Sequence, residues 1–491
     1  MRILRGLVCL LLVASLYSLR AAEDAPKIEF VPAEFTFPIS DWYGIYGPDG
    51  KKIGFAHMHI TESKEGTPSF VNHMTMHMQM KAMGNEIRMD MDETEVFDAQ
   101  PPYQVRSSTA TIVQGPTTQK VHAERGDKGM DLTIEQGGKS RTLKFDPQTY
   151  SMTDVVSQTI WLKKQKPAVG AKLSVQHADL SEGVLSTDTY TVASVKEVPV
   201  NGVPVTYFEL QVSSSKFGDV GLARSDAEGK LLSAKIGGLL EMRLEPEDQA
   251  KDIGVSSDLF VLSQALVDKP LGNPKDITHL VLEASGPPVG KIPNGPCQSV
   301  EKTDQANVVI VRMGTKDGKP AEATKEEFDE ALTETAEYPV KDAQVIALAK
   351  EAVGDAKTDR EKVDRLVHFV YKYVEPTYSV KPTTVFDILK TRKGDCTVHT
   401  LLFTALARAA GIPARPVQGL IYMGDKFKAF GGHAWNEVAL DGHWVPVDST
   451  WDEVEVNACH LSFGSDKHGM GTFVALIGQI KLKLKEVELR K

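Results

Sequence analysis

Hydrophobic and polar residues alternate over much of the first 285 positions of the chain, with the period of two that is typical of β-strands. The runs 203–212 and 231–242 show this alternation most clearly, and turn-forming pairs such as Asn201-Gly202 and Glu228-Gly229 precede them. The pattern predicts an antiparallel sheet of many strands, arranged as one curved sheet or as two packed lobes.

A run of alternating methionine and polar residues, 73–80, has two readings. The four methionines at even positions would share one face of a strand, and the polar residues would share the other face. Histidine and methionine together could also bind a soft metal ion such as copper outside the cytoplasm. No ligand set of fixed geometry is visible, so we expect the methionines to pack in the core.

Beyond position 322 the hydrophobic period changes to that of α-helices. Helices are predicted over the ranges 325–338, 342–353, 359–373 and 397–410. Asp395 is a suitable N-cap for the last of them, and Gly411 ends it. Strand-like runs follow this helix, and the order of helices and then strands indicates an α+β domain.

Segments rich in proline and glycine suggest where the chain divides. The stretch 286–296 contains too many of these residues to continue a helix or a strand. We therefore expect a β-rich antiparallel region over 23–285, a linker over 286–321 and an α+β domain over 322–491.

The N-terminus has the pattern of a secretory signal peptide over residues 1–22. Arg2 and Arg5 precede an apolar run over 6–16, and small residues follow at 18–22. The apolar run is too short for a durable membrane span. We expect a soluble protein, exported to the periplasm or the extracellular space. An uncleaved signal that acts as an anchor is the alternative.

The net charge of the chain limits the classes of partner that we expect it to bind. The formal net charge is −10, and removal of residues 1–22 would take away three arginines and no acid. Such an acidic surface disfavours nucleic acid and anionic membranes as partners. We expect a protein or peptide substrate instead, whereas the oligomeric state is open.

A predicted hairpin brings a histidine and an aspartate together. The runs 436–440 and 443–447 flank Asp441-Gly442, a two-residue turn signal. In that register Leu440 opposes His443, so His433 and Asp448 become diagonal neighbours on one face of the sheet. A carboxylate in this position can orient the imidazole ring.

Cys396 supplies the third group, because it opens the predicted helix over 397–410. The positive end of the helix dipole favours the nucleophilic thiolate there. Cys396 would attack a carbonyl, and His433 would pair with the thiolate and protonate the leaving amine. The Cys396 backbone N–H is the natural first oxyanion donor, with Tyr378 as a weaker candidate for the second.

Four blocks of sequence resemble the transglutaminase-like superfamily, a circularly rearranged relative of the papain fold. They are residues 393–399, 402–415, 433–437 and 444–450, in the order found in that family. The resemblance covers about the last third of the chain. It implies a papain-like α+β domain with a Cys-His-Asp triad at Cys396, His433 and Asp448, which acts on amides through a thioester. Val398 and Ser449 depart from the usual pattern, without touching the triad.

Two other readings involve the remaining cysteines and histidines. Cys396 and His399, with Cys459-His460 downstream and His433 and His443 between, could form a zinc site, although their spacing is not typical of one. Cys297 and Cys459 could form a disulfide that leaves Cys396 free, or could both be buried thiols.

The sequence therefore predicts an exported thiol enzyme that acts on peptide or glutamine-type amides, as a cysteine protease, an amidase or a transglutaminase. An inactive scaffold or binding protein with the same fold is the alternative. The proposed chemistry needs no metal and no other cofactor. The substrate, the choice between water and an amine, and the role of the β-rich region are open.

Overall fold

The computed structural model divides into two compact units, Met1–Leu259 and Phe260–Lys491. The residues that it describes run from 28 to 490, except for 65, 83–84, 115–116, 137, 146–149, 180–183, 201–202, 216–217, 255–257, 259–263, 287–288, 320, 336, 378–383, 466–471, 474–475 and 477. The expected signal peptide over 1–22 lies outside the described residues.

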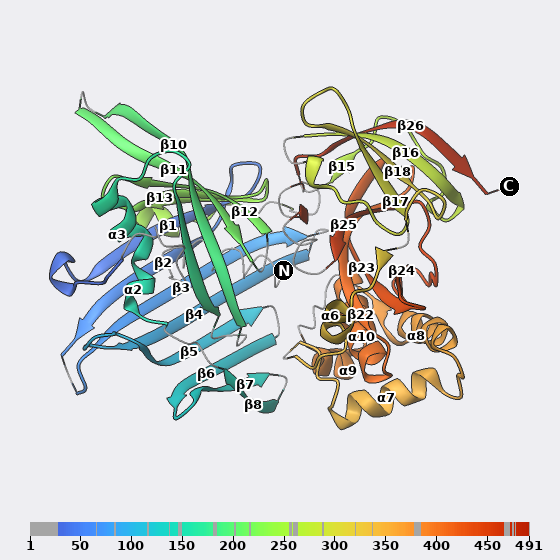
Figure 1. The fold of residues 1–491 in the computed structure, drawn as a ribbon, viewed down its shortest axis with the longest axis horizontal. Coiled ribbons are helices and arrows are strands. Elements are labelled where there is room, and N and C mark those ends of the chain that lie inside the picture. Colours follow the sequence, from blue (N-terminus) through green and yellow to red (C-terminus); the bar gives the residue numbers. More distant parts are fainter. Residues whose placement is uncertain are drawn as a thin grey trace. The chain divides into compact units, whose positions relative to one another are not determined.

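The first unit is built on one antiparallel sheet of 14 strands, in the order β8-β7-β6-β5-β4-β3-β2-β1-β14-β13-β12-β11-β10-β9. Figure 1 shows this sheet as strongly bent, with β2–β8 in blue and cyan and β10–β13 in green. The sequence left open whether this region forms one curved sheet or two packed lobes, and the structure shows one continuous sheet. The strands are β1 Ile39–Tyr46, β2 Lys52–Ser63, β3 Ser69–Ala82, β4 Asn85–Asp98, β5 Val105–Gln114, β6 Thr117–Gly126, β7 Gly129–Gln136, β8 Lys139–Phe145, β9 Lys172–Asp179, β10 Val184–Val200, β11 Val203–Ser214, β12 Gly218–Asp226, β13 Leu231–Ile236 and β14 Leu240–Glu245.

Short helices interrupt the strands of this unit, which the alternating pattern did not predict. The segment between β8 and β9 forms α2 Met152–Val155, α3 Ser157–Ile160 and a π-helical turn Trp161–Gln165. Gln158 donates a hydrogen bond to Ser225 of β12 over 2.8 Å, so the segment packs on the sheet. Elsewhere in the unit lie a 3-10 turn, Pro32–Glu34, and α4 Glu247–Lys251.

The expected packing of the methionine run is confirmed. Met74, Met76, Met78 and Met80 are all buried on one face of β3, and Met76 and Met78 oppose Met91 and Met89 of β4. The histidines of the run lie on the other face, where His73 contacts Asp92 over 3.1 Å.

The second unit contains two larger antiparallel sheets and a helical layer. One sheet has the order β19-β24-β23-β22-β25, with β15 paired to β23, and the other has the order β17-β18-β16-β26. Its strands are β15 Ala265–Leu266, β16 Ile277–Ser285, β17 Gln298–Lys302, β18 Val308–Met313, β19 Ala321–Glu322, β20 Glu375–Pro376, β21 Lys393–Gly394, β22 Ala414–Tyr422, β23 Ala429–Leu440, β24 His443–Val447, β25 His460–Ser465 and β26 Lys481–Leu489.

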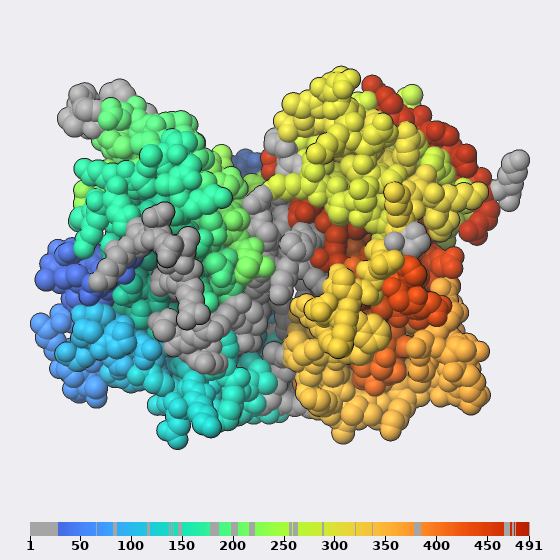
Figure 2. All heavy atoms as spheres, in the orientation of Figure 1, coloured from blue at the N-terminus to red at the C-terminus, as the bar shows by residue number. Residues whose placement is uncertain are grey.

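The helical layer packs on the β22–β25 sheet. Its helices are α6 Lys325–Glu330, α7 Ala343–Val353, α8 Asp359–Tyr373, α9 Val385–Thr391 and α10 Cys396–Ala409. One buried cluster joins Val367 of α8 and Leu402 of α10 to Val438 of β23. In Figure 1 these helices gather at one end of the unit, and α7 and α8 contribute to its outer surface, orange in Figure 2.

Two helices differ from the sequence-based expectation. Helix α6 ends at Glu330 rather than at 338, because threonine side chains compete with helical hydrogen bonds there. Thr335 accepts a bond from the Tyr338 N–H over 3.1 Å, which closes a turn instead of a helix. Helix α9 was not predicted, although Thr384 caps it by accepting from the Asp387 N–H.

The proposed domain limits differ from the observed division. The segment 286–321, expected to be a linker, contains β17 and β18, and β16 within the expected β-rich region pairs with β18. A short 3-10 turn, Val289–Lys291, lies between β16 and β17. Another 3-10 turn, Pro274–Asp276, precedes β16. The chain thus enters the second unit near residue 260.

Among the described residues, no helix combines the length and the apolar character needed to cross a membrane.

Candidate active site

Cys396 is the first residue of helix α10, as the sequence predicted. The Asp395 side chain caps this helix by accepting a hydrogen bond from the Thr397 N–H over 3.0 Å. Most of the helix is buried, with Leu402, Phe403 and Leu406 inaccessible. The buried helix body and its cap thus hold the thiol at the positive end of the helix dipole.

His433 and Asp448 come from the hairpin of β23 and β24, whose predicted register is confirmed. Leu440 opposes His443, and the pairing continues to Asn436 opposite Val447. The turn residues Asp441 and Gly442 have φ values of 51° and 79°, as a type I′ turn requires. His433 Nε2 lies 2.7 Å from Asp448 Oδ2, so the carboxylate fixes the ring.

Cys396 is half-buried, and its thiol is among the groups that act on the buried His433 ring. The side chain of Asp448 is inaccessible, and His433 is 6% exposed. With Nε2 directed at Asp448, the other ring nitrogen is the one available to the thiol. The structure thus pairs the predicted imidazole directly with the predicted carboxylate.

Burial and charge act in opposite directions on these groups. Burial lowers the pKa of His433, but the negative charges of Asp448 and Cys396 outweigh it and raise this pKa to about 10. Burial raises the pKa of Asp448, but His433 and His460 hold it well below its usual range. The site therefore favours a charged imidazolium beside the Asp448 carboxylate.

His460, at the start of β25, is a further member of the site that the sequence reasoning did not assign. Its Nε2 lies 3.1 Å from the same Oδ2 of Asp448, and it is 4% exposed. Its nearness to Asp448 follows from β25 pairing with β22, where His460 opposes Ile421. This pairing joins strands distant in sequence, and no local turn signal marks it.

Two tryptophans line the paired imidazoles. The ring centroid of Trp435 lies 5.9 Å from that of His433, and Trp451 lies 6.4 Å from it. Trp444 lies elsewhere: the Arg415 guanidinium is 3.8 Å from its ring centroid, and it packs with Ala331 and Ala439. Its side chain points to the opposite face of β24 from that of Val447.

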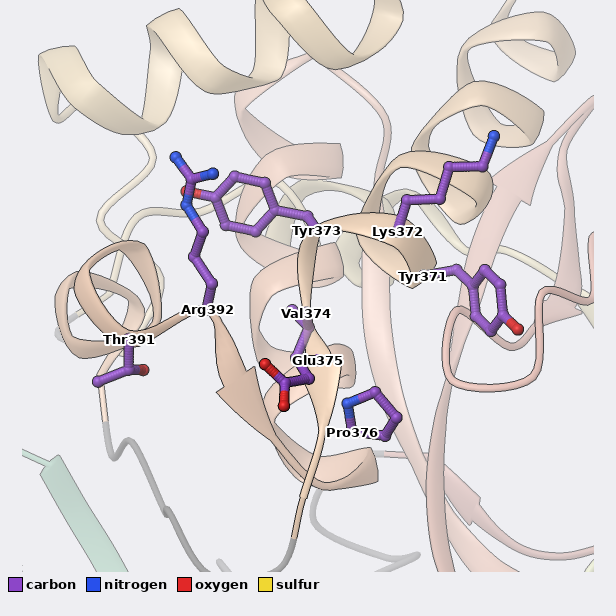
Figure 3. Close-up of a pocket in the computed structure, with 8 residues that line it drawn as sticks. All are labelled: Tyr371, Lys372, Tyr373, Val374, Glu375, Pro376, Thr391 and Arg392. Atoms are coloured by element: carbon purple, nitrogen blue, oxygen red, sulfur yellow. The ribbon is translucent and has the colours of Figure 1, made fainter.

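A surface pocket of about 520 Å³ lies close to the start of α10 in the chain. It is lined by Tyr371 to Pro376, Thr391 and Arg392. In Figure 3 Arg392 and Tyr373 lie side by side, and the guanidinium is 4.6 Å from the ring centroid. The parallel pair β20–β21 joins the pocket to Gly394, two residues before Cys396. Tyr378, the candidate oxyanion donor, lies outside the described residues.

The other two described cysteines are free thiols, so the Cys297–Cys459 disulfide is not formed. Cys297 packs near Val417 and Trp435, and burial raises its pKa to about 12. Cys459 is buried and contacts the carbonyl oxygen of Pro274 over 3.1 Å. Its pKa is raised well above its usual range, again by burial. Neither thiol has the imidazole partner that Cys396 has in His433.

The residues of the zinc alternative do not come together as that reading required. His399 Nδ1 lies 2.9 Å from the carbonyl oxygen of Asp395, and His443 is bound to its own turn. Among the described residues, the one cluster with metal-type ligand atoms within 4.8 Å is His433, Asp448 and His460. In this cluster the Nε2 atoms of His433 and His460 contact the same oxygen of Asp448, which is the arrangement of a hydrogen-bond network.

Comparisons with known proteins concern the part of the chain that carries this site. A sequence profile of the transglutaminase-like superfamily matches residues 346–449. The kyphoscoliosis peptidases of Homo sapiens and Mus musculus are 32% and 31% identical over an alignment of 118 positions, and the match covers 21% of this chain. The matched part covers 17% of the length of each of these relatives.

A solved structure is also similar, that of a candidate cysteine protease from Cytophaga hutchinsonii. It is 15% identical, with 44% of this chain and 87% of that chain covered and a TM-score of 0.29. The family assignment rests on the matches in sequence. The chain carries a domain of the transglutaminase-like superfamily near its C-terminus.

Proposed function

We propose that the second unit is a thiol enzyme that cleaves peptide-type amides through a thioester on Cys396. The observation that carries this proposal is the buried His433 ring, which is hydrogen-bonded to Asp448 and whose pKa responds to the Cys396 thiol. A thiol, a base and an orienting carboxylate in contact are the groups needed for nucleophilic acyl transfer.

The first step forms the thioester. The Cys396 sulfur attacks the amide carbon, and the carbonyl oxygen becomes an oxyanion. The backbone N–H of Cys396 is free of helical partners at the first position of α10 and can stabilise this charge. Tyr378 remains our candidate for the second donor. His433 then gives its proton to the amine nitrogen, and the C–N bond breaks.

The second step resolves the thioester. His433 takes a proton from the incoming nucleophile, which attacks the thioester carbon and releases the Cys396 thiolate. We assign water as this nucleophile, because the relatives with matching sequence are named peptidases. A primary amine would give transamidation at the same site. The pocket of Tyr371 to Pro376 beside Arg392 offers aromatic and cationic contacts for a peptide.

We further propose that the protein is exported after cleavage near residue 22.

Mass spectrometry of peptide mixtures tests the proposed reaction. The protein without residues 1–22 is incubated with peptides that contain glutamine, with and without a labelled primary amine. Cleaved peptides, or glutamine converted to glutamate, indicate hydrolysis, and labelled peptides indicate amine transfer. Cys396→Ala should abolish every product, whereas Cys459→Ser should keep them. The absence of any product above the level of Cys396→Ala would overturn the proposal and favour an inactive scaffold.

A further inference from the structure

The carboxylate of Asp448 serves two imidazoles. Its Oδ2 lies 2.7 Å from His433 Nε2 and 3.1 Å from His460 Nε2, while its Oδ1 accepts from the Thr450 N–H over 2.7 Å. An ionised carboxylate oxygen can only accept a hydrogen bond. The Nε2 atoms of His433 and His460 must therefore each carry a hydrogen. The reaction described above uses His433 alone, which leaves the second ring without a role.

The other side of the His460 ring also faces an acceptor. Its Nδ1 lies 3.3 Å from Asn457 Oδ1, which accepts from the Cys459 N–H over 2.8 Å. The Asn457 amide cannot be flipped without loss of bonds, because its Nδ2 donates to Glu453 Oε1 over 2.8 Å. The oxygen must therefore face His460, and a ring between two acceptors is doubly protonated.

The charges around His460 agree with a positively charged ring. Glu453 accepts from both the backbone and the side chain of Asn457, as a carboxylate does. Burial raises the pKa of Glu453, and the charge of His460 opposes this rise. Other titratable groups that act on the cluster are Cys396 and His399 of α10, and Cys459 and Lys275, which interact with Glu453.

We propose that His460 is a positioning residue of the thiol site: as an imidazolium it holds Asp448 in common with His433 and keeps the His433 proton transferable. The physical reason is competition for one carboxylate. If Asp448 interacted with His433 alone, it would hold the imidazolium proton more tightly, and the leaving amine would receive it more slowly. This role rests on the proposed thiol chemistry, whereas the charge of His460 does not.

Nuclear magnetic resonance of ¹⁵N-histidine in the full chain tests the charge of His460 directly. Ring signals are assigned from their loss in His460→Gln and His433→Gln. At pH 7 the wild-type His460 ring should show two protonated nitrogens. A ring with one unprotonated nitrogen would overturn the proposal, whether or not any variant folds.

The effect on His433 is tested with His460→Gln, which keeps an N–H donor near Asp448 but removes the charge. Deprotonation of His433 should move to higher pH by about one unit, which is typical of the loss of a nearby like charge. His368→Gln is the matched control, because His368 is half exposed and pairs with Asp452 away from the triad. An unchanged His433 titration in folded His460→Gln would contradict the proposal. Slow alkylation of Cys396 in the wild type would instead contradict the proposed function.

Discussion

Asp448 is the residue on which the contacts of the site converge. Its side chain is inaccessible to solvent and accepts hydrogen bonds from His433, His460 and the Thr450 N–H. Burying a carboxylate is costly unless it is paired and its oxygens are satisfied, and these three contacts meet that need. The carboxylate therefore has a structural role and a role in orienting His433.

Asp448→Asn should impair both roles. The amide leaves buried cationic imidazoles without their anion, so we expect about 3 kcal/mol lower free energy of unfolding. Alkylation of Cys396 at pH 6 should fall by about 100-fold or more, since an amide cannot hold the imidazolium. Asp452→Asn is the control, because Asp452 is partly exposed, pairs with His368 rather than with the triad, and has a φ of 61°, which asparagine tolerates. Equal effects of the two changes would contradict this assignment.

The pKa of His433 predicts how stability depends on pH. A group with a folded-state pKa of about 10, against about 6.5 when unfolded, stabilises the fold fully below pH 6.5. That contribution is lost as the pH rises toward 10. The difference in unfolding free energy between wild type and His433→Gln should therefore shrink between these limits. Denaturation followed by tryptophan fluorescence at several pH values measures it, and a constant difference would argue against the charged pair.

At the scale of elements, helix α10 and the β23–β24 hairpin position the site through local signals. The Asp395 cap and the Asp441-Gly442 turn each depend on neighbours in sequence, and the sequence predicted both. The short α6 and the helical segment 152–165 depend instead on side-chain competition and tertiary packing. His460 was missed for the same reason, because the pairing of β25 with β22 joins distant segments.

The cap of α10 should matter more for reactivity than for stability. Asp395→Ala removes the acceptor of the Thr397 N–H and should cost about 1 kcal/mol. It should also slow alkylation of Cys396, because the first turn no longer holds the thiol toward His433. Thr358→Ala removes the equivalent cap of α8, where Thr358 accepts from the Glu361 N–H, and serves as the control. It should cost a similar stability and leave alkylation unchanged. Equal alkylation rates in both variants would refute this prediction.

Gly419 of β22 gives a second test at this scale. It pairs with His433 of β23, and a methyl group there would lie 2.6 Å from Trp435 Cη2 and clash with the Leu461 carbonyl oxygen. Gly419→Ala should therefore lower the unfolding free energy by about 2 kcal/mol and displace the tryptophan beside His433. Gly290→Ala meets nothing within 4 Å and is the control. A Gly419→Ala protein as stable and reactive as that control would contradict the close packing.

At the scale of the whole molecule, one chain holds three described free thiols in different surroundings. Cys297 and Cys459 are held by burial in their neutral forms, whereas Cys396 has a charged imidazole beside it. Cys297 and Cys459 can therefore serve as internal controls of low reactivity when the reactivity of Cys396 is measured.

The most direct measurement is alkylation of the folded full chain with iodoacetamide at pH 6 and pH 8, mapped to each cysteine by mass spectrometry. We predict fast labelling of Cys396 that persists at pH 6, with Cys297 and Cys459 unlabelled until the protein is unfolded. Labelling of Cys396 should become slow in His433→Gln. Labelling no faster than that of a free thiol, and lost at pH 6, would contradict an active Cys396–His433–Asp448 site.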